Sequence, residues 1–146
     1  MKWESFSAED TESIGAEFAK TLTPGRVITL DGELGAGKTA FARGVLRGLG
    51  YTGRVTSPTF AIANEYDTET VSVVHFDMYR ILDAEALAEL GFEEYMDGQR
   101  ILLIEWSQNI KEALPSRYDA VSIVYGTKTD SRVITIEEVQ NENFKL

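Results

Sequence analysis

Residues 32–39 read GELGAGKT and match the spacing G-x-x-x-x-G-K-S/T of a phosphate-binding loop. In such a loop the glycines let the backbone wrap around an anion, so that several amide N–H groups point at the phosphates. The spacing predicts that Lys38 reaches the β- and γ-phosphates and that the Thr39 hydroxyl binds Mg²⁺. The ordinary alternative is a Gly-rich turn that matches by chance, and the flanking segments distinguish the two.

The segments on either side are those that a phosphate-binding loop requires. Residues 27–30 (VITL) form an apolar run of β type, and apolar side chains follow the loop at Phe41, Val45 and Leu49, which is helical spacing. A helix that begins at the loop adds the positive end of its dipole to the phosphate site. Strand, loop and helix together predict that the chain binds a nucleoside triphosphate.

Two carboxylates occupy positions where phosphoryl chemistry needs them, at the carboxyl ends of strands in an open α/β sheet. Glu105 directly follows residues 101–104 (ILLI), an apolar run typical of a strand buried on both faces of a parallel sheet. Asp77 follows the β-type run 73–76. Either acid can be the carboxylate beside the metal ion, although a lone acid is usually a solvated surface charge. Their positions after strands, in a chain with a phosphate loop, favour the functional interpretation.

Three neighbouring side chains each have a functional and a structural interpretation. His75, the only histidine, shares a strand face with Asp77 and could join it at a metal ion. We predict instead a packed, hydrogen-bonded histidine, the commoner situation in a strand. Trp106 can be core or can pack near the nucleotide. Arg80 can orient a phosphate, bridge to another protein or form a surface salt bridge, and the sequence leaves these open.

Helical patterns occur at three further places. Ser7 has the character of an N-cap, and the apolar stripe that follows it extends to Leu22. Asp83 is the expected N-cap of a short helix that carries Leu87 and Leu90. A third helical stretch follows Glu105 and ends at Leu114, before a proline.

Two hairpins are expected from short connections between β-type runs. Residues 61–66 and 71–76 are joined by so short a link that they must pair antiparallel, because a parallel pair needs a crossover. Residues 120–125 and 132–137 form a second hairpin around a turn at 126–128. The predicted fold is therefore α/β: a P-loop NTPase-like mixed β-sheet flanked by helices, with a C-terminal β-hairpin.

Composition limits the possible partners. The length of 146 residues favours a single domain over residues 1–146. The formal net charge is −10, and the basic residues form no cluster, which argues against direct binding to a nucleic-acid backbone. We find no apolar run of membrane-spanning length, no secretory-signal core at the first residues and no cysteine. We therefore expect a cytoplasmic protein without membrane contact.

Four stretches, taken together, point to one family. They are residues 32–39 (GELGAGKT), 57–60 (SPTF), 75–80 (HFDMYR) and 103–106 (LIEW). Many NTPases share the first, whereas the other three are much more specific in this order and spacing. The chain resembles the bacterial threonylcarbamoyladenosine biosynthesis ATPases of the TsaE family, and the resemblance extends from about Phe6 to Arg132.

This resemblance implies a P-loop ATPase that binds ATP with Mg²⁺ and hydrolyses it slowly, with stimulation by partner proteins. The implied partners are TsaB-like and TsaD-like proteins, which install threonylcarbamoyl on the adenosine beside the tRNA anticodon. Hydrolysis is then expected to reset this assembly for another cycle. Contact with tRNA is expected only through the partners, which agrees with the acidic composition of the chain.

The resemblance also assigns roles to residues. Lys38, Glu105 and Asp77 are implied in hydrolysis, and Thr39, Glu105 and Asp77 in binding the metal. Thr59 is implied as a switch-like residue near the γ-phosphate. The full implied set of nucleotide-binding residues is Thr11, Gly35, Ala36, Gly37, Lys38, Thr39, Ala40, Thr59, Trp106 and Arg132. One departure is Gln108, which stands where the family often has an acid and so argues against a second acid in that loop.

Two other functions use the same loop. A small-molecule kinase usually carries an Arg-rich lid over the transferred phosphoryl group, and no Arg-dense insertion is present in this sequence. A non-catalytic, ATP-gated interaction module is also possible, because loss of a γ-phosphate removes several charge-assisted hydrogen bonds that can order an interface.

Overall fold

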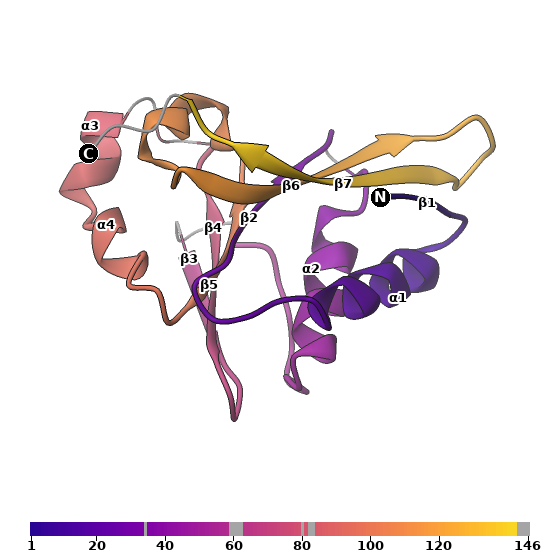
Figure 1. The fold of residues 1–146 in the computed structure, drawn as a ribbon. Helices are drawn as coiled ribbons and strands as arrows, with labels where there is room; N and C mark the ends of the chain where they lie inside the picture. Colours follow the sequence, from indigo (N-terminus) through magenta and orange to yellow (C-terminus); the bar gives the residue numbers. More distant parts are fainter. Residues whose placement is uncertain (34, 59–62, 80, 82–83, 143–146) are drawn as a thin grey trace.

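One seven-stranded mixed sheet forms the centre of the computed structural model, which describes residues 1–33, 35–58, 63–79, 81 and 84–142 (Figure 1). The strands are β1 (Lys2–Ser5), β2 (Val27–Asp31), β3 (Ala63–Asp67), β4 (Ser72–Asp77), β5 (Ile101–Glu105), β6 (Arg117–Tyr125) and β7 (Arg132–Gln140). Their order is β1-β7-β6-β2-β5-β4-β3. The pairs β2–β5, β2–β6 and β4–β5 are parallel, and the other three are antiparallel. The predicted mixed α/β sheet is confirmed.

Helices cover both faces of the sheet. They are α1 (Ala8–Ala19), α2 (Lys38–Gly48), α3 (Ala84–Glu89), α4 (Phe92–Tyr95) and the 3₁₀ helix η1 (Ser107–Ala113). On one face, Phe41 and Val45 of α2 belong to the core that contains Ile28 and Leu30 of β2. On the other face, residues of α3, α4 and η1 pack with alternate residues of β4 and β5. Because helices pack on both faces of the sheet, β5 is buried at every residue, as its apolar sequence predicts.

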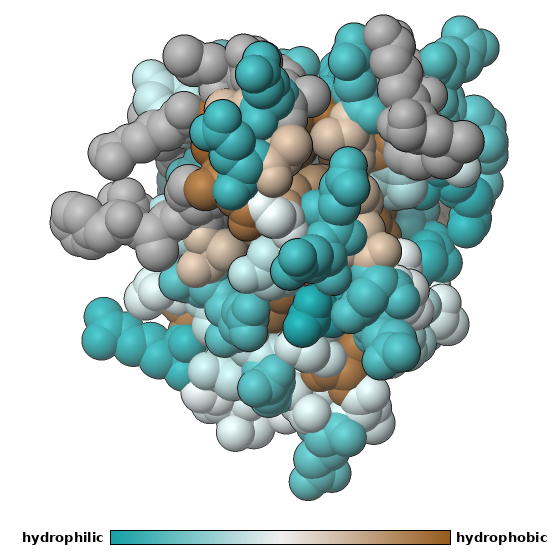
Figure 2. Space-filling view, turned by 90° about the vertical axis from the view of Figure 1, so that its left-hand side faces the viewer, coloured by the Kyte–Doolittle hydropathy of each residue, from teal (hydrophilic) through white to brown (hydrophobic). Residues whose placement is uncertain are grey.

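The side that carries α3 and α4 is mainly hydrophilic. In Figure 2, small hydrophobic areas on this side lie between polar side chains. Within the ranges that the structure describes, we find no helix that combines the length and the apolar character needed to cross a membrane.

Both predicted hairpins are present. β3 and β4 pair antiparallel, although residues 61 and 62 of the first predicted run lie outside the described residues. β6 and β7 form the C-terminal hairpin, and both strands are longer than predicted because their pairing continues from Tyr125↔Arg132 to Arg117↔Gln140.

The structure corrects two expectations and adds one strand. The first helix ends at Ala19 rather than near Leu22, which is held instead by a turn in which its N–H donates to the carbonyl oxygen of Ala19 (3.1 Å). Leu90 lies beyond α3 and is 48% exposed, while its predicted N-cap Asp83 lies outside the described residues. Strand β1 was not predicted, because its pattern is too short and polar to read without its partner β7.

Helices α1 and α2 meet at backbone distance. A Cβ atom on Gly44 of α2 would clash with the carbonyl oxygen of Glu12 in α1, and one on Gly15 of α1 would lie 2.5 Å from the carbonyl oxygen of Phe41. Real Cβ atoms do not approach backbone oxygen this closely, so only glycine permits the observed packing. This contact places α1 directly beside the helix that follows the phosphate-binding loop.

We expect Gly44→Ala to lower the free energy of unfolding by about 1–3 kcal/mol, because the added methyl group overpacks a backbone contact. Helix propensity alone predicts the opposite sign, a gain of about 1 kcal/mol for glycine to alanine inside a helix. Urea denaturation of the two proteins decides between these outcomes. A more stable variant would show that the helices are not in close contact.

Candidate functional site

The loop between β2 and α2 has the backbone geometry that its glycines predict. Gly35 has φ of 79° and Gly37 has φ of 114°, both in the left-handed region that residues with a side chain rarely adopt. Helix α2 begins at Lys38 without a side-chain cap and without an acid in its first turn. The first N–H groups of an α-helix have no partner within the helix, so this end of α2 is suited to bind an anion.

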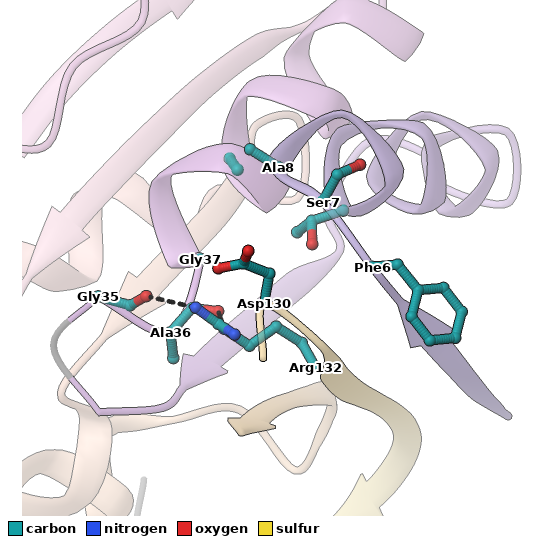
Figure 3. A pocket seen from close by; sticks show the side chains of 10 residues that line it. Phe6, Ser7, Ala8, Gly35, Ala36, Gly37, Asp130 and Arg132 are labelled. Carbon is teal, nitrogen blue, oxygen red and sulfur yellow. Dashed lines mark hydrogen bonds between the residues drawn. The ribbon is translucent and has the colours of Figure 1, made fainter. Parts of the chain in front are cut away.

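Arg132 of β7 contacts the backbone of the phosphate-binding loop. Its Nε donates to the carbonyl oxygen of Ala36 (3.1 Å), and its Nη2 lies 3.5 Å from the carbonyl oxygen of Gly35. The guanidinium group lies over the ring of Tyr125, 4.4 Å from the centroid. Arg132, for which the family resemblance implies a place at the nucleotide, is therefore tied to the loop backbone (Figure 3).

A cavity of about 360 Å³ opens beside the loop (Figure 3). It is lined by Phe6, Ser7, Ala8, Thr11, Gly35, Ala36, Gly37, Ala40, Asp130 and Arg132. The structure thus brings Thr11 and Arg132, which are far apart in the sequence, to one cavity with the loop. Sequence reasoning missed Phe6 and Asp130, since neither belongs to a motif.

A buried cluster of charged and polar groups lies where the loop meets the sheet. The Nζ atom of Lys38 is 3.6 Å from Oε1 of Glu105, and the two side chains are only 7% and 6% exposed. The other carboxylate oxygen, Oε2, is 2.6 Å from Nε2 of the fully buried His75. The prediction that His75 is packed and hydrogen-bonded is confirmed.

The parallel pairing of the sheet explains why these groups meet. Glu105 is in register with Leu30 at the end of β2 and with Asp77 at the end of β4. The carboxyl ends of the three strands therefore lie at one edge, where the loop leaves β2. Asp77 is half-buried there, and its Oδ1 accepts a hydrogen bond from the N–H of Tyr79 (2.9 Å).

Glu105 is ionised at neutral pH despite its burial. Burial raises the pKa of Glu105, but the hydrogen bond from His75, together with the charge and hydrogen bond of Lys38, outweighs burial. Its pKa consequently lies below the ordinary value of 4.5. The carboxylate can therefore accept a proton or bind a cation.

Trp106 covers the ammonium group of Lys38. Its ring centroid is 4.5 Å from Nζ, close enough for a cation–π interaction, and the ring of Tyr79 meets it edge-on at 5.0 Å. Trp106 has φ of 58°, which is uncommon for a residue other than glycine and can mark a functional site. The indole is half-buried beside the loop, so it is more than a core residue.

Asp31, at the end of β2, is a further acid of the site that sequence reasoning missed. Its position directly before Gly32, the first residue of the phosphate-binding loop, could have indicated it. Burial raises the pKa of Asp31, and the charges of Lys111 and Lys38 only partly oppose this. Asp31 and Gly32 also line a second cavity of about 510 Å³, together with Trp106 and Gln108. The start of the loop thus faces one cavity and its glycine-rich end faces the other.

The predicted metal-binding residues supply only oxygen ligands. Thr39 lies in the first turn of α2, and Glu105 and Asp77 lie at neighbouring strand ends. Over the described ranges there is no group of three or more His, Cys, Asp or Glu side chains that could hold a metal. Such a sparse oxygen set fits Mg²⁺, which keeps several waters and binds through phosphates. Thr59 and Arg80 lie outside the described residues.

This sheet order, with a glycine-rich loop between β2 and α2 and acids at the adjacent strand ends, defines a P-loop NTPase-like protein. The family model for the threonylcarbamoyl adenosine biosynthesis protein TsaE matches residues 5–134. The chain belongs to this family.

Individual relatives agree with that membership. A tRNA threonylcarbamoyladenosine biosynthesis protein TsaE from Bacillus subtilis (strain 168) is 40% identical over 141 residues, which cover 97% of this chain and 87% of the relative. The protein of the same name from Rickettsia typhi is 41% identical over 109 residues, 74% of this chain and 75% of that protein. The crystal structure of Bacillus subtilis YdiB superposes with a TM-score of 0.81 at 35% identity, covering 99% of this chain and 88% of YdiB.

We expect the Lys38–Glu105 contact to be energetically coupled. In a double-mutant cycle with Lys38→Met and Glu105→Gln, the double variant should be more stable than the sum of the single losses predicts, by about 1–3 kcal/mol. The reason is that each single variant leaves one buried group without its charged partner. Urea denaturation of all four proteins without nucleotide measures the coupling, and simple additivity would contradict it.

Proposed function

We propose that this chain is an ATPase subunit of the machinery that makes threonylcarbamoyladenosine in tRNA, acting in the cytosol as one P-loop domain over residues 1–146. The observation that carries the proposal is the buried pair of Lys38 and Glu105 where the phosphate-binding loop meets the sheet. Family membership and the names of the relatives support the pathway.

In this proposal the loop binds the phosphates of ATP. The amides from Gly35 to Thr39 and the N-terminal end of α2 bind phosphate oxygens, and Lys38 exchanges part of its contact with Glu105 for the β- and γ-phosphates. Thr11, Ala40 and Arg132 line the cavity beside the loop, which accommodates the rest of the nucleotide. The choice of adenine follows from the family.

Thr39, Glu105 and Asp77 are the residues that would hold Mg²⁺, whose charge would stabilise the negative charge of the transferred phosphoryl group. Glu105 is ionised and lies beside Lys38, so its carboxylate is suited to orient the attacking water and take up a proton. Trp106 covers Lys38 and limits the access of solvent to the charged pair.

TsaB-like and TsaD-like proteins are the proposed partners, and tRNA is bound through them. The chain is acidic, with a net charge of −10, and its basic residues form no cluster in the sequence of the kind that tracks a nucleic-acid backbone. A partner that holds the RNA removes the need for one.

One observation also favours an ATP-gated interaction module. Tyr79 is 65% exposed and contacts Trp106, which itself covers Lys38, so a shift of Lys38 toward phosphate would reach an exposed aromatic side chain. Nucleotide binding and turnover, measured with and without the partners and tRNA, distinguish the two functions. A small-molecule kinase would instead transfer phosphate to a metabolite.

Lys38→Met should weaken ATP binding by about 2–4 kcal/mol, or roughly 30- to 1,000-fold, because it removes a buried charge partner of the phosphates. Isothermal titration calorimetry measures the affinity. Lys20→Met is the matched control, since the Lys20 side chain is 69% exposed and lies at the end of α1. Equal affinity of the Lys38 variant and the control would contradict the proposed phosphate site.

Glu105→Gln should keep ATP affinity close to that of the wild type and lower hydrolysis by about 100-fold or more, as expected when a general base is lost. Modification of tRNA over repeated cycles should fall with it. Release of inorganic phosphate and threonylcarbamoyladenosine content are the two measurements, with Glu65→Gln, an exposed acid of β3, as the control. Full modification by a variant that cannot hydrolyse ATP would favour the interaction module.

A further inference from the structure

His75 is a buried polar side chain of the site to which the proposed reaction gives no task. It lies on β4, in register with Leu103, and the side chain is fully buried. Its Nε2 is 2.6 Å from Oε2 of Glu105. A carboxylate accepts hydrogen bonds and does not donate them, so Nε2 carries the proton in this contact.

The other nitrogen of the imidazole ring, Nδ1, does not account for a histidine at this position. Among the described residues, Nδ1 of His75 is buried and has no hydrogen-bond partner. An unpartnered buried nitrogen is unfavourable, and an apolar side chain of similar size would avoid it. Packing alone therefore does not explain a histidine here, whereas the bond to Glu105 does.

The two oxygens of Glu105 have partners of different kinds. Oε1 faces Lys38, whose Nζ is 3.6 Å away and which belongs to the phosphate-binding loop. Lys38 has a second possible partner in bound phosphate. His75 is fully buried in the sheet and its Nε2 contacts Glu105, so Oε2 keeps this partner when Lys38 turns away.

We propose that His75 is a positioning residue for hydrolysis: its Nε2–H fixes Oε2 of Glu105, so that Oε1 is the oxygen presented to the reacting water and the metal side of the loop. This inference rests on the proposed ATPase function and assigns a part of it to a residue outside the phosphate-binding loop. Without His75, the carboxylate can rotate and follow Lys38, and its productive orientation is lost.

Three variants of His75 test this role. His75→Leu removes both ring nitrogens, His75→Gln places an amide N–H near the position of Nε2, and His75→Asn carries the same amide one carbon short of Glu105. We expect the Leu and Asn variants to lower kcat by about 10- to 100-fold, the usual effect of removing a group that orients a catalytic or metal-binding side chain. The Gln variant should recover most of kcat, and all three should bind ATP within about 2-fold of the wild type.

A measurement without nucleotide tests the contact itself. Because His75 is the only histidine, its imidazole gives a single set of ¹⁵N NMR signals. We expect protonation at Nε2 and not at Nδ1, with an Nε2 proton protected from exchange, and Glu105→Ala should shift this signal. Protonation at Nδ1, or a signal that Glu105→Ala leaves unchanged, would overturn the proposal.

The outcomes separate this inference from the function on which it rests. Wild-type protein that hydrolyses ATP while His75→Asn and His75→Gln match it in kcat would overturn the role of His75 and leave the ATPase intact. Equal losses in the Gln and Asn variants would point to a structural role and would also overturn it. Wild-type protein that does not hydrolyse ATP would remove the proposed function itself.

Discussion

A buried ammonium group needs an anionic partner, and in this chain that need connects the loop to the sheet. Lys38 is 7% exposed and finds its partner in Glu105, at the end of the buried strand β5. Each member of the pair has a further partner, since His75 contacts Glu105 and Trp106 covers Lys38. A triphosphate offers Lys38 a competing anion, so its binding must rearrange the contact between Lys38 and Glu105.

The parallel part of the sheet supplies the geometry. β2, β5 and β4 are adjacent and parallel, so their carboxyl ends bring Asp31, Glu105 and Asp77 to one edge. Negative groups so close to a phosphate site would repel the ligand if nothing balanced them. Lys38, the amide-rich start of α2 and the expected Mg²⁺ provide that balance, while burial raises the pKa of Asp31 and so disfavours its charged form.

Sequence patterns predicted the structural features that depend on residues close together in the chain. The glycine spacing at residues 32–39, the apolar strand before Glu105 and the short links of both hairpins each depend on nearby residues, and the structure has the predicted fold. The contacts that were missed join distant segments. Strand β1 exists only because β7 pairs with it, the bond from His75 to Glu105 requires the register of β4 on β5, and Asp130 reaches the cavity through the β6–β7 turn. No spacing rule encodes such pairings.

The loop is enclosed in a ring of contacts that begins and ends with it. Its helix α2 rests on α1 through Gly44, and Thr11 of α1 is hydrogen-bonded to Ser5 of β1 (2.6 Å). Ser5 is in register with Arg132 of β7, which returns to the loop at Ala36. The first few residues of the chain, which carry no motif, are thus part of the scaffold around the phosphate-binding loop. A truncation at the amino terminus would remove one link of that scaffold and, under the proposed function, would disturb the binding of nucleotide.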